Sequence, residues 1–244
     1  MGNVNAMKVG LYVYGLAALF LGAVGLVFAD FADVWQPVPK EVPLRAILAY
    51  SVGAALVAGG AGVWLARTRR YAALALTALF GLDVVLLHGA HILAQPLVLV
   101  SWTGAAEQLA VAMGALVIWA ATFDPKNATA VKAARLAFGV CAIGFGAAHF
   151  EYMQPTADWV PKYFPNPAFW AALTGAAHIL AGIALLADLK AKLAARLSTA
   201  MYAVFGLLVH APGLLAHPHD HFWWCANAVN LTLVGAAWAL SDEL

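Results

Sequence analysis

The stretch His149–Ile183, HFEYMQPTADWVPKYFPNPAFWAALTGAAHILAGI, joins a loop of four prolines to an uncharged apolar run. Proline is tolerated in the first turn of a helix, so Pro167 predicts the point at which the apolar run becomes helical. The run continues for about 20 residues, which is enough to cross a hydrocarbon core of about 30 Å. The stretch therefore predicts a membrane-spanning helix preceded by a proline-stiffened loop.

The rest of the chain has the same character. Of its 244 residues, 64% are hydrophobic and 10% are charged, and the mean hydropathy is +0.83. A soluble domain would carry about 25% charged residues. The composition predicts an all-α integral membrane protein in contact with the lipid bilayer. The net charge of +1 argues against a nucleic-acid partner. We read Cys141 and Cys225 as buried free thiols.

We expect eight transmembrane helices, because the apolar runs are separated by connections that contain Pro or charge. Their approximate ranges are 9–29, 44–66, 71–93, 96–121, 132–150, 167–187, 195–215 and 222–241. The N-terminus and the even-numbered connections hold ten basic residues, namely Lys8, Arg67, Arg69, Arg70, Lys126, Lys132, Arg135, Lys190, Lys192 and Arg196. The opposite side holds three, Lys40, Arg45 and Lys162. This asymmetry predicts a cell (inner) membrane protein with both termini cytoplasmic.

A shift of 122 residues aligns the two halves of the chain without a gap. Val38–Lys40 then meets Val160–Lys162, both reading VPK. Further matched pairs are Gly22 and Gly144, Gly53 and Gly175, Gly60 and Gly182, His88 and His210, Pro96 and Pro218, and Trp102 and Trp224. Because each half has an even number of helices, both enter the membrane in the same direction. We expect two parallel four-helix modules, residues 1–122 and 123–244, related by a pseudo-twofold axis along the membrane normal.

The second half resembles the DoxX-like membrane proteins. The resemblance rests on AAHFEYMQPTADWVPKYFPNPAFWAALTGAAHILAGIALL, residues 147–186, and on LLVHAPGLL, residues 207–215. The first half is similar more loosely, so the resemblance implies two fused four-helix modules. Many such modules carry Glu near the position of His178, and this chain departs from that pattern. Some relatives are membrane subunits of thiosulfate:quinone oxidoreductase or partners in thiol-redox complexes, which implies redox work near quinone and other membrane or periplasmic redox subunits as partners.

Two carboxylates lie far inside the predicted helices. Asp83 and Glu107 each lie about 15 Å from the outer membrane surface at 1.5 Å per residue. Ionisable groups at such depth are costly and usually functional. Two adjacent carboxyl groups in a dry site would share a proton, so the pair is a candidate proton relay. The alternative is that each is neutral and hydrogen-bonded within the helix bundle.

Three histidines of the second module lie on three different helices. His149 ends one helix, His178 lies near the midplane, and His210 lies near an outer helix end. They are candidate ligand residues together with Asn227, and a quinone is the favoured ligand. Because the estimated depths of His149 and His178 differ by about 16 Å, we do not expect one compact site for all three. Hydrogen-bonded core histidines and polar amides that join helices are the structural alternatives.

Haem and a divalent metal are less favoured cofactors. His88 and His210 are matched positions, so each could supply one axial ligand to a haem on the pseudo-twofold axis. His91 shares a helix face with His88. The segment HPHDH from His217 could bind a metal weakly, but a solvated loop with Trp224 as an interface anchor is the simpler interpretation.

The leading functional hypothesis is a subunit of a quinone-linked membrane redox system, with its site near the outer face of the second module. A small-molecule or ion transporter and a non-catalytic scaffold subunit are the alternatives. Against the transporter, no paired Gly or Pro interruption is evident at mid-depth. The residues leave open whether the protein is itself an enzyme.

The topology can be tested by cysteine accessibility. In intact cells, an impermeant thiol reagent should label Asp158→Cys, in an outer loop, and should not reach Thr68→Cys, in a cytoplasmic loop. Labelling of position 68 from outside, or protection of position 158, would contradict the orientation.

Overall fold

The computed structural model describes residues 8–123 and 128–244, and within these the chain is helical without strands. Lys126 lies outside the described residues. The long helical segments are α1 (Val9–Phe28), α2 (Arg45–Trp64), α3 (Arg69–Leu82) with η2 (Asp83–His88) and α4 (Gly89–Ala94), α5 (Leu99–Phe123), α6 (Ala128–Glu151), α8 (Pro167–Ala187), α9 (Ala191–Phe205) with η3 (Gly206–His210) and α10 (Ala211–Ala216), and α11 (His221–Glu243). They lie within four residues of the predicted ranges. Two short helices in loops were not predicted, η1 (Asp33–Trp35) and α7 (Met153–Asp158).

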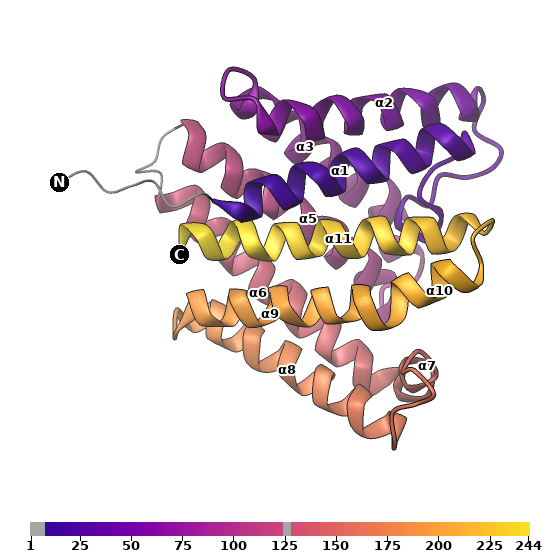
Figure 1. Ribbon diagram of the computed structural model, residues 1–244, viewed down its shortest axis with the longest axis vertical. Helices are drawn as coiled ribbons and strands as arrows, with labels where there is room; N and C mark the ends of the chain where they lie inside the picture. Colours follow the sequence, from indigo (N-terminus) through magenta and orange to yellow (C-terminus); the bar gives the residue numbers. More distant parts are fainter. Residues whose placement is uncertain (1–7, 124–127) are drawn as a thin grey trace.

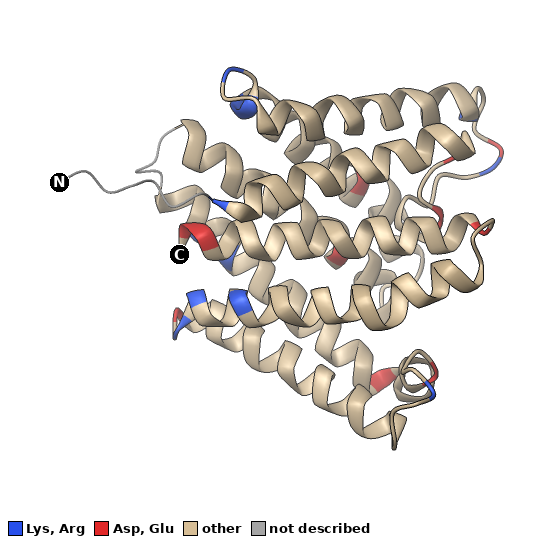
Figure 2. Cartoon of the chain, viewed as in Figure 1, with Lys and Arg blue, Asp and Glu red and all other residues tan. Residues whose placement is uncertain are grey.

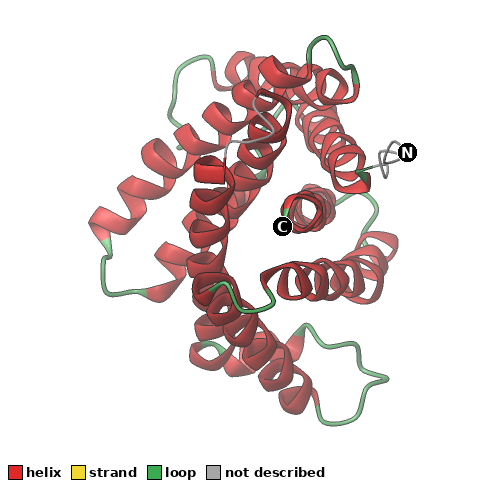
Figure 3. Ribbon diagram, turned by 90° about the vertical axis from the view of Figure 1, so that its left-hand side faces the viewer, coloured by secondary structure: helices red, strands yellow, loops and turns green. Residues whose placement is uncertain are grey.

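Seven of these segments are long and apolar enough to cross a membrane. The eighth, α11, falls short in apolar character because it carries Asn227 and Asn230 in its middle. It is nevertheless largely buried, and Figure 3 shows it, ending at C, enclosed by other helices. Its amides therefore face protein, where hydrogen-bond partners are available.

The helix contacts come in matched pairs. Helix α1 packs on α2, as α6 packs on α8, and α5 packs on α3, as α11 packs on α9. Across the middle, α11 packs on α1 and α5 packs on α6 (Figure 1). Thus the last long helix of each half contacts the first long helix of the other.

Glycines bring α1 against α2 and α6 against α8. A Cβ atom at Gly60 would lie 2.4 Å from the carbonyl oxygen of Gly15, and one at Gly182 would lie 2.6 Å from that of Gly139. Real Cβ atoms do not approach backbone so closely, so only glycine permits these helix separations. Small residues at such crossings let the backbones gain van der Waals contact, which drives helix association in lipid.

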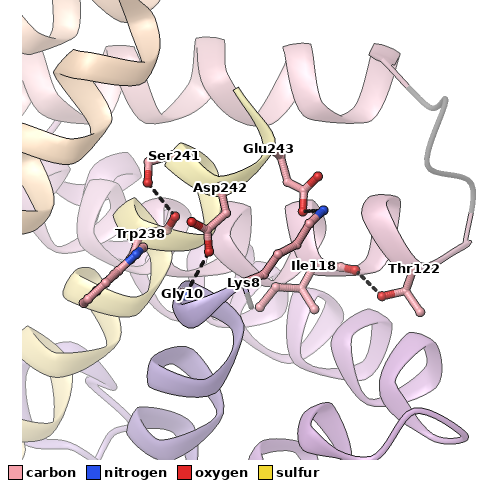
Figure 4. A network of polar contacts seen from close by, with 8 residues as sticks. All are labelled: Lys8, Gly10, Ile118, Thr122, Trp238, Ser241, Asp242 and Glu243. Atoms are coloured by element: carbon pink, nitrogen blue, oxygen red, sulfur yellow. Dashed lines mark hydrogen bonds and ion pairs between the residues drawn. The ribbon is translucent and has the colours of Figure 1, made fainter. Parts of the chain in front are cut away.

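The chain ends are tied together at one end of the bundle (Figure 4). The Gly10 amide donates to the carboxylate of Asp242 at 2.9 Å, and Lys8 pairs with Glu243. The carboxylate satisfies one of the free amides in the first turn of α1, and its charge suits a helix N-terminus. Figure 2 shows that Lys and Arg also gather at this end.

The segments α3–η2–α4 and α9–η3–α10 each contain a π-helical turn, and the two turns are at matched positions. These turns end at His88 in η2 and at His210 in η3, residues that are 122 apart. In the segment α9–η3–α10, Pro212 has no N–H to donate to the carbonyl of Leu208, which accounts for a local change of hydrogen-bonding register. No Gly or Pro is paired between the two copies here, in line with the sequence. The paired π turns were not expected, because such a turn needs neither Gly nor Pro in both copies.

The glycine contacts generate a stability prediction. Gly60→Ala and Gly182→Ala should each lower the free energy of unfolding by about 1–3 kcal/mol, because the helices must separate to admit a methyl group. Gly144→Ala is the matched control, since nothing lies within 4 Å of a Cβ there. Thermal unfolding in detergent checks this, and equal stability of the three variants would contradict the packing.

Candidate functional site

A cavity of about 620 Å³ lies at the end of the bundle opposite both chain termini. Helices α5, α6, α8, α9 with η3, and α11 surround it, and the segment 155–164 covers it. It is lined by Val34, Trp35, Val100, Thr103, Gly104, Glu107, His149, Pro155, Thr156, Trp159, Val160, Pro161, Phe164, Trp170, Ala171, Thr174, Val204, Phe205, Leu208, Val209, His210 and Phe222. Mostly apolar and aromatic walls with a few polar groups are typical of small-molecule sites.

His149 is held in one orientation at the cavity wall. Its Nδ1 lies 3.1 Å from the carbonyl oxygen of Ala171 and 3.1 Å from the hydroxyl of Thr174. A carbonyl only accepts, so these contacts place the ring hydrogen on Nδ1. In the neutral imidazole, Nε2 is then the acceptor left for another partner.

His149 and His178 lie much closer together than their estimated depths suggested. Their ring centroids are 5.3 Å apart. The depth estimate was wrong because it assumed that the end of α6 is level with the start of α8. In fact His149 lies against Gly175, so the first turns of α8 project about 12 Å beyond it. His178 follows Gly175 by three residues, which is less than one helical turn further along α8.

His178 lies beneath the cavity rather than on its wall. Only 2% of its surface is exposed, and its Nδ1 has no hydrogen-bond partner among the described residues. The rings of Phe145 and Tyr202 pack on it, with centroids at 5.6 and 5.5 Å. A polar ring buried among aromatics without a partner for one nitrogen is costly unless another group supplies the bond.

His210 lines the cavity from η3, whereas Asn227 lies outside it. The Nδ1 of His210 is buried without a described partner, and its ring lies 6.0 Å from that of Trp159. Asn227 gives both amide hydrogens to backbone carbonyls, those of His210 at 2.7 Å and Trp223 at 2.8 Å. Asn227 thus fixes the π turn that carries His210, in keeping with the expectation that amides on this helix join helices.

The two buried carboxylates have separate surroundings. Asp83 accepts a hydrogen bond from Gln36 at 2.9 Å. Glu107 lines the cavity, as Trp35 does. Within the described residues no hydrogen bond joins the two carboxylates, so the shared proton stays a prediction. The sequence analysis placed Glu107 with the first module alone and missed its position in this cavity.

The loop after α1 supplies part of the cavity wall through Trp35. Its carbonyl oxygen lies 3.1 Å from Nε2 of His88 and 2.9 Å from the amide nitrogen of Gln108, and its indole stacks on Phe222 at 5.5 Å. His88 therefore uses the nitrogen that would bind haem to hold this loop. This partner disfavours the axial pairing with His210.

The proline-rich loop is also more than a connection. Trp159 and Phe164 line the cavity from it, so the loop contributes to the site as well as leading into α8. Trp35 and Trp159 belong to the related VPK segments of the two halves. Both nevertheless line this one cavity, which a sequence alignment alone does not indicate.

The remaining metal candidates have structural partners. In residues 8–123 and 128–244, no three His, Cys, Asp or Glu side chains are placed to share a metal ion. In the HPHDH segment, Asp220 caps α11 by accepting from the Phe222 amide, and His217 stacks on Trp223. Cys141 and Cys225 are both free and buried, as expected.

These features define a multi-pass α-helical membrane protein with an aromatic-walled cavity at one end. The DoxX family model matches residues 130–211, from α6 to the first residue of α10, which supports a DoxX-like membrane protein. The matched segment covers about a third of the chain and includes His149, His178 and His210. Comparison with curated proteins and with solved structures gave no match.

The Asn227 contacts predict a stability effect. Asn227→Ala should lower the free energy of unfolding by about 1 kcal/mol, since each interhelical hydrogen bond in a membrane is worth about 0.6 kcal/mol. Gln95→Ala, at an exposed position, is the control and should change nothing. Chemical unfolding in mixed micelles measures both, and an unchanged Asn227→Ala would show that the π turn needs no side-chain support.

Proposed function

We propose that the protein is a quinone-binding subunit of a membrane redox system. The observation that carries the proposal is the cavity of about 620 Å³, whose walls are aromatic and whose polar groups are few. Its volume falls within the usual range for small-molecule sites, about 300–1,000 Å³. Trp35, Trp159 and Trp170 offer flat surfaces for a ring.

The polar groups of the cavity suit the oxygen atoms of a quinone. His210 has an unpartnered ring nitrogen, and whichever nitrogen carries the hydrogen can donate to a carbonyl. His149 presents Nε2, which accepts from a hydroxyl when neutral and donates to a carbonyl when protonated. The two histidines therefore serve both the oxidised and the reduced form of such a ligand.

A bound quinone would supply two-electron, two-proton chemistry, with electrons from a partner subunit in or beside the membrane. The part of this chain is to bind, orient and protonate. Glu107 lines the same cavity, so it can exchange a proton with the ligand oxygen. The aromatic cover formed by Trp159 and Phe164 limits access of water.

We further propose that all eight long helices span an inner membrane as two parallel four-helix modules with cytoplasmic termini. The matched helix contacts and the matched π turns support the pseudo-twofold arrangement. The concentration of Lys and Arg at the end with both termini supports the orientation. The cavity then faces the outer side, where a periplasmic redox partner could reach it.

A small-molecule transporter is the second candidate function. The observation that favours it is the pair of π turns within the long segments α3–η2–α4 and α9–η3–α10. Such turns often occur at functional sites, and their matched positions are the feature of this fold that most resembles the paired breaks of discontinuous transporter helices.

The quinone site can be tested by ligand binding to the purified protein in detergent. Short-chain ubiquinone should quench tryptophan fluorescence with a saturable dependence on concentration. His149→Ala and His210→Ala should each weaken the apparent affinity about tenfold or more, because each removes a polar partner of the ligand. His178→Ala should weaken it too, by removing the support under His149.

His91→Ala is the surface control and should bind as the unchanged protein does. His88→Ala leaves Gln108 as a partner of the Trp35 carbonyl, so it should weaken binding less than His210→Ala. An equal loss for His88→Ala and His210→Ala would favour a shared axial cofactor. Linear, non-saturable quenching in every variant would contradict a quinone site and would favour the transporter or the scaffold.

A further inference from the structure

A column of buried polar side chains continues below the cavity into the second module. Its members are His178 on α8 and Tyr202 and Ser198 on α9, with exposed fractions of 2%, 2% and 1%. The Nδ1 of His178, the hydroxyl of Tyr202 and the hydroxyl of Ser198 are all buried, and none has a hydrogen-bond partner among the described residues.

The three side chains follow one another from the cavity toward the end that holds the chain termini. His178 lies 5.3 Å from the ring of His149 on the cavity wall and 5.5 Å from the ring of Tyr202. Ser198 precedes Tyr202 by four residues, so it lies on the same face of α9, about 6 Å further along. Helices α8 and α9 lie side by side (Figure 1), which brings the column together.

The matched positions of the first module are apolar. Residues 122 earlier are Leu56 for His178, Phe80 for Tyr202 and Leu76 for Ser198, and all three are fully buried. Val27 corresponds to His149. The fold is therefore compatible with an apolar column here, and packing does not explain why the second module has polar atoms at all four positions.

Tyr14 shows how a buried tyrosine is normally accommodated in this protein. Its hydroxyl donates to the carbonyl oxygen of Val111 at 2.9 Å. Buried polar groups nearly always have such partners, and those without a protein partner are usually bonded to buried water. The three atoms are closed to solvent in this structure, so three consecutive groups without protein partners mark a column that water must enter to satisfy them.

We propose that His178, Tyr202 and Ser198 form a hydrated proton path that feeds the cavity from the cytoplasmic half of the membrane. The proposal rests on the proposed quinone function, in which two protons accompany two electrons. Each proton that His178 receives on one ring nitrogen is balanced by one released from the other toward His149. The side chains end unchanged, and the electrons come from the partner subunit.

The surroundings of Tyr202 suit this role. Its backbone carbonyl accepts from the amide of Asn230 at 3.1 Å, which fixes α9 against α11. Glu107 and Cys141 lie within electrostatic range of its hydroxyl. Because Glu107 also lines the cavity, the path has two protonatable neighbours at its upper end, His149 and Glu107.

The test measures proton exchange at His178 directly. The protein is labelled with ¹⁵N-histidine, reconstituted in lipid bilayers and transferred to D₂O, and His178→Leu identifies the His178 signal by solid-state NMR. In the unchanged protein the His178 ring N–H should exchange rapidly and receive magnetisation from water. Tyr202→Phe and Ser198→Leu, which copy the first module, should slow exchange about tenfold or more while leaving thermal stability unchanged or higher.

The matched control is Tyr14→Phe, which should lower thermal stability and leave exchange at His178 unchanged. No water contact at His178 in the unchanged protein would overturn the path. Unaltered exchange in Ser198→Leu would overturn the cytoplasmic direction and with it the proposal. Saturable quinone quenching is measured on the same samples, so failure of the quinone site is distinguished from failure of the path.

Discussion

A polar atom inside a bilayer has no bulk water to bond to, so it needs a partner within the protein, a buried water or a ligand. Most buried polar groups here have protein partners. The indole nitrogens of Trp102 and Trp224 donate to the carbonyl oxygens of Pro96 and Pro218, each at 2.9 Å. Such bonds hold helix ends and loops in both halves and belong to the scaffold. Among the described residues, four of the seven buried side-chain atoms without a protein partner lie in or below the cavity, on His178, Ser198, Tyr202 and His210.

Several structural features recur in both halves of the chain, whereas the polar side chains in and below the cavity do not. Helix contacts, π turns and Trp–Pro hydrogen bonds recur at positions 122 residues apart. The polar residues His149, His178 and Tyr202 have apolar counterparts. A ligand site in the second half alone therefore requires no departure from the common backbone, only substitutions on the inner faces of its helices.

The sequence was sufficient to predict the helices, because an apolar run long enough to cross the membrane leaves little choice of secondary structure. The helix predicted at 167–187 coincides with α8. The depth at which each helix begins or ends in the membrane could not be predicted from the sequence, since it depends on how the loops fold. This is why the proximity of His149 and His178 was missed. The position of Glu107 was missed for a related reason, because the loop carrying Trp35 crosses from one half to the cavity of the other.

The central claim is that a single quinone site lies in the cavity of the second half. Photo-crosslinking with an azido-quinone, followed by mass spectrometry of the labelled peptides, tests it most directly. The account predicts labels on the cavity-lining segments, chiefly 155–164 and 204–210, that excess ubiquinone removes. Equal labelling of the corresponding segment 82–88, which lies outside the cavity wall, or labelling that excess ubiquinone does not displace, would contradict it.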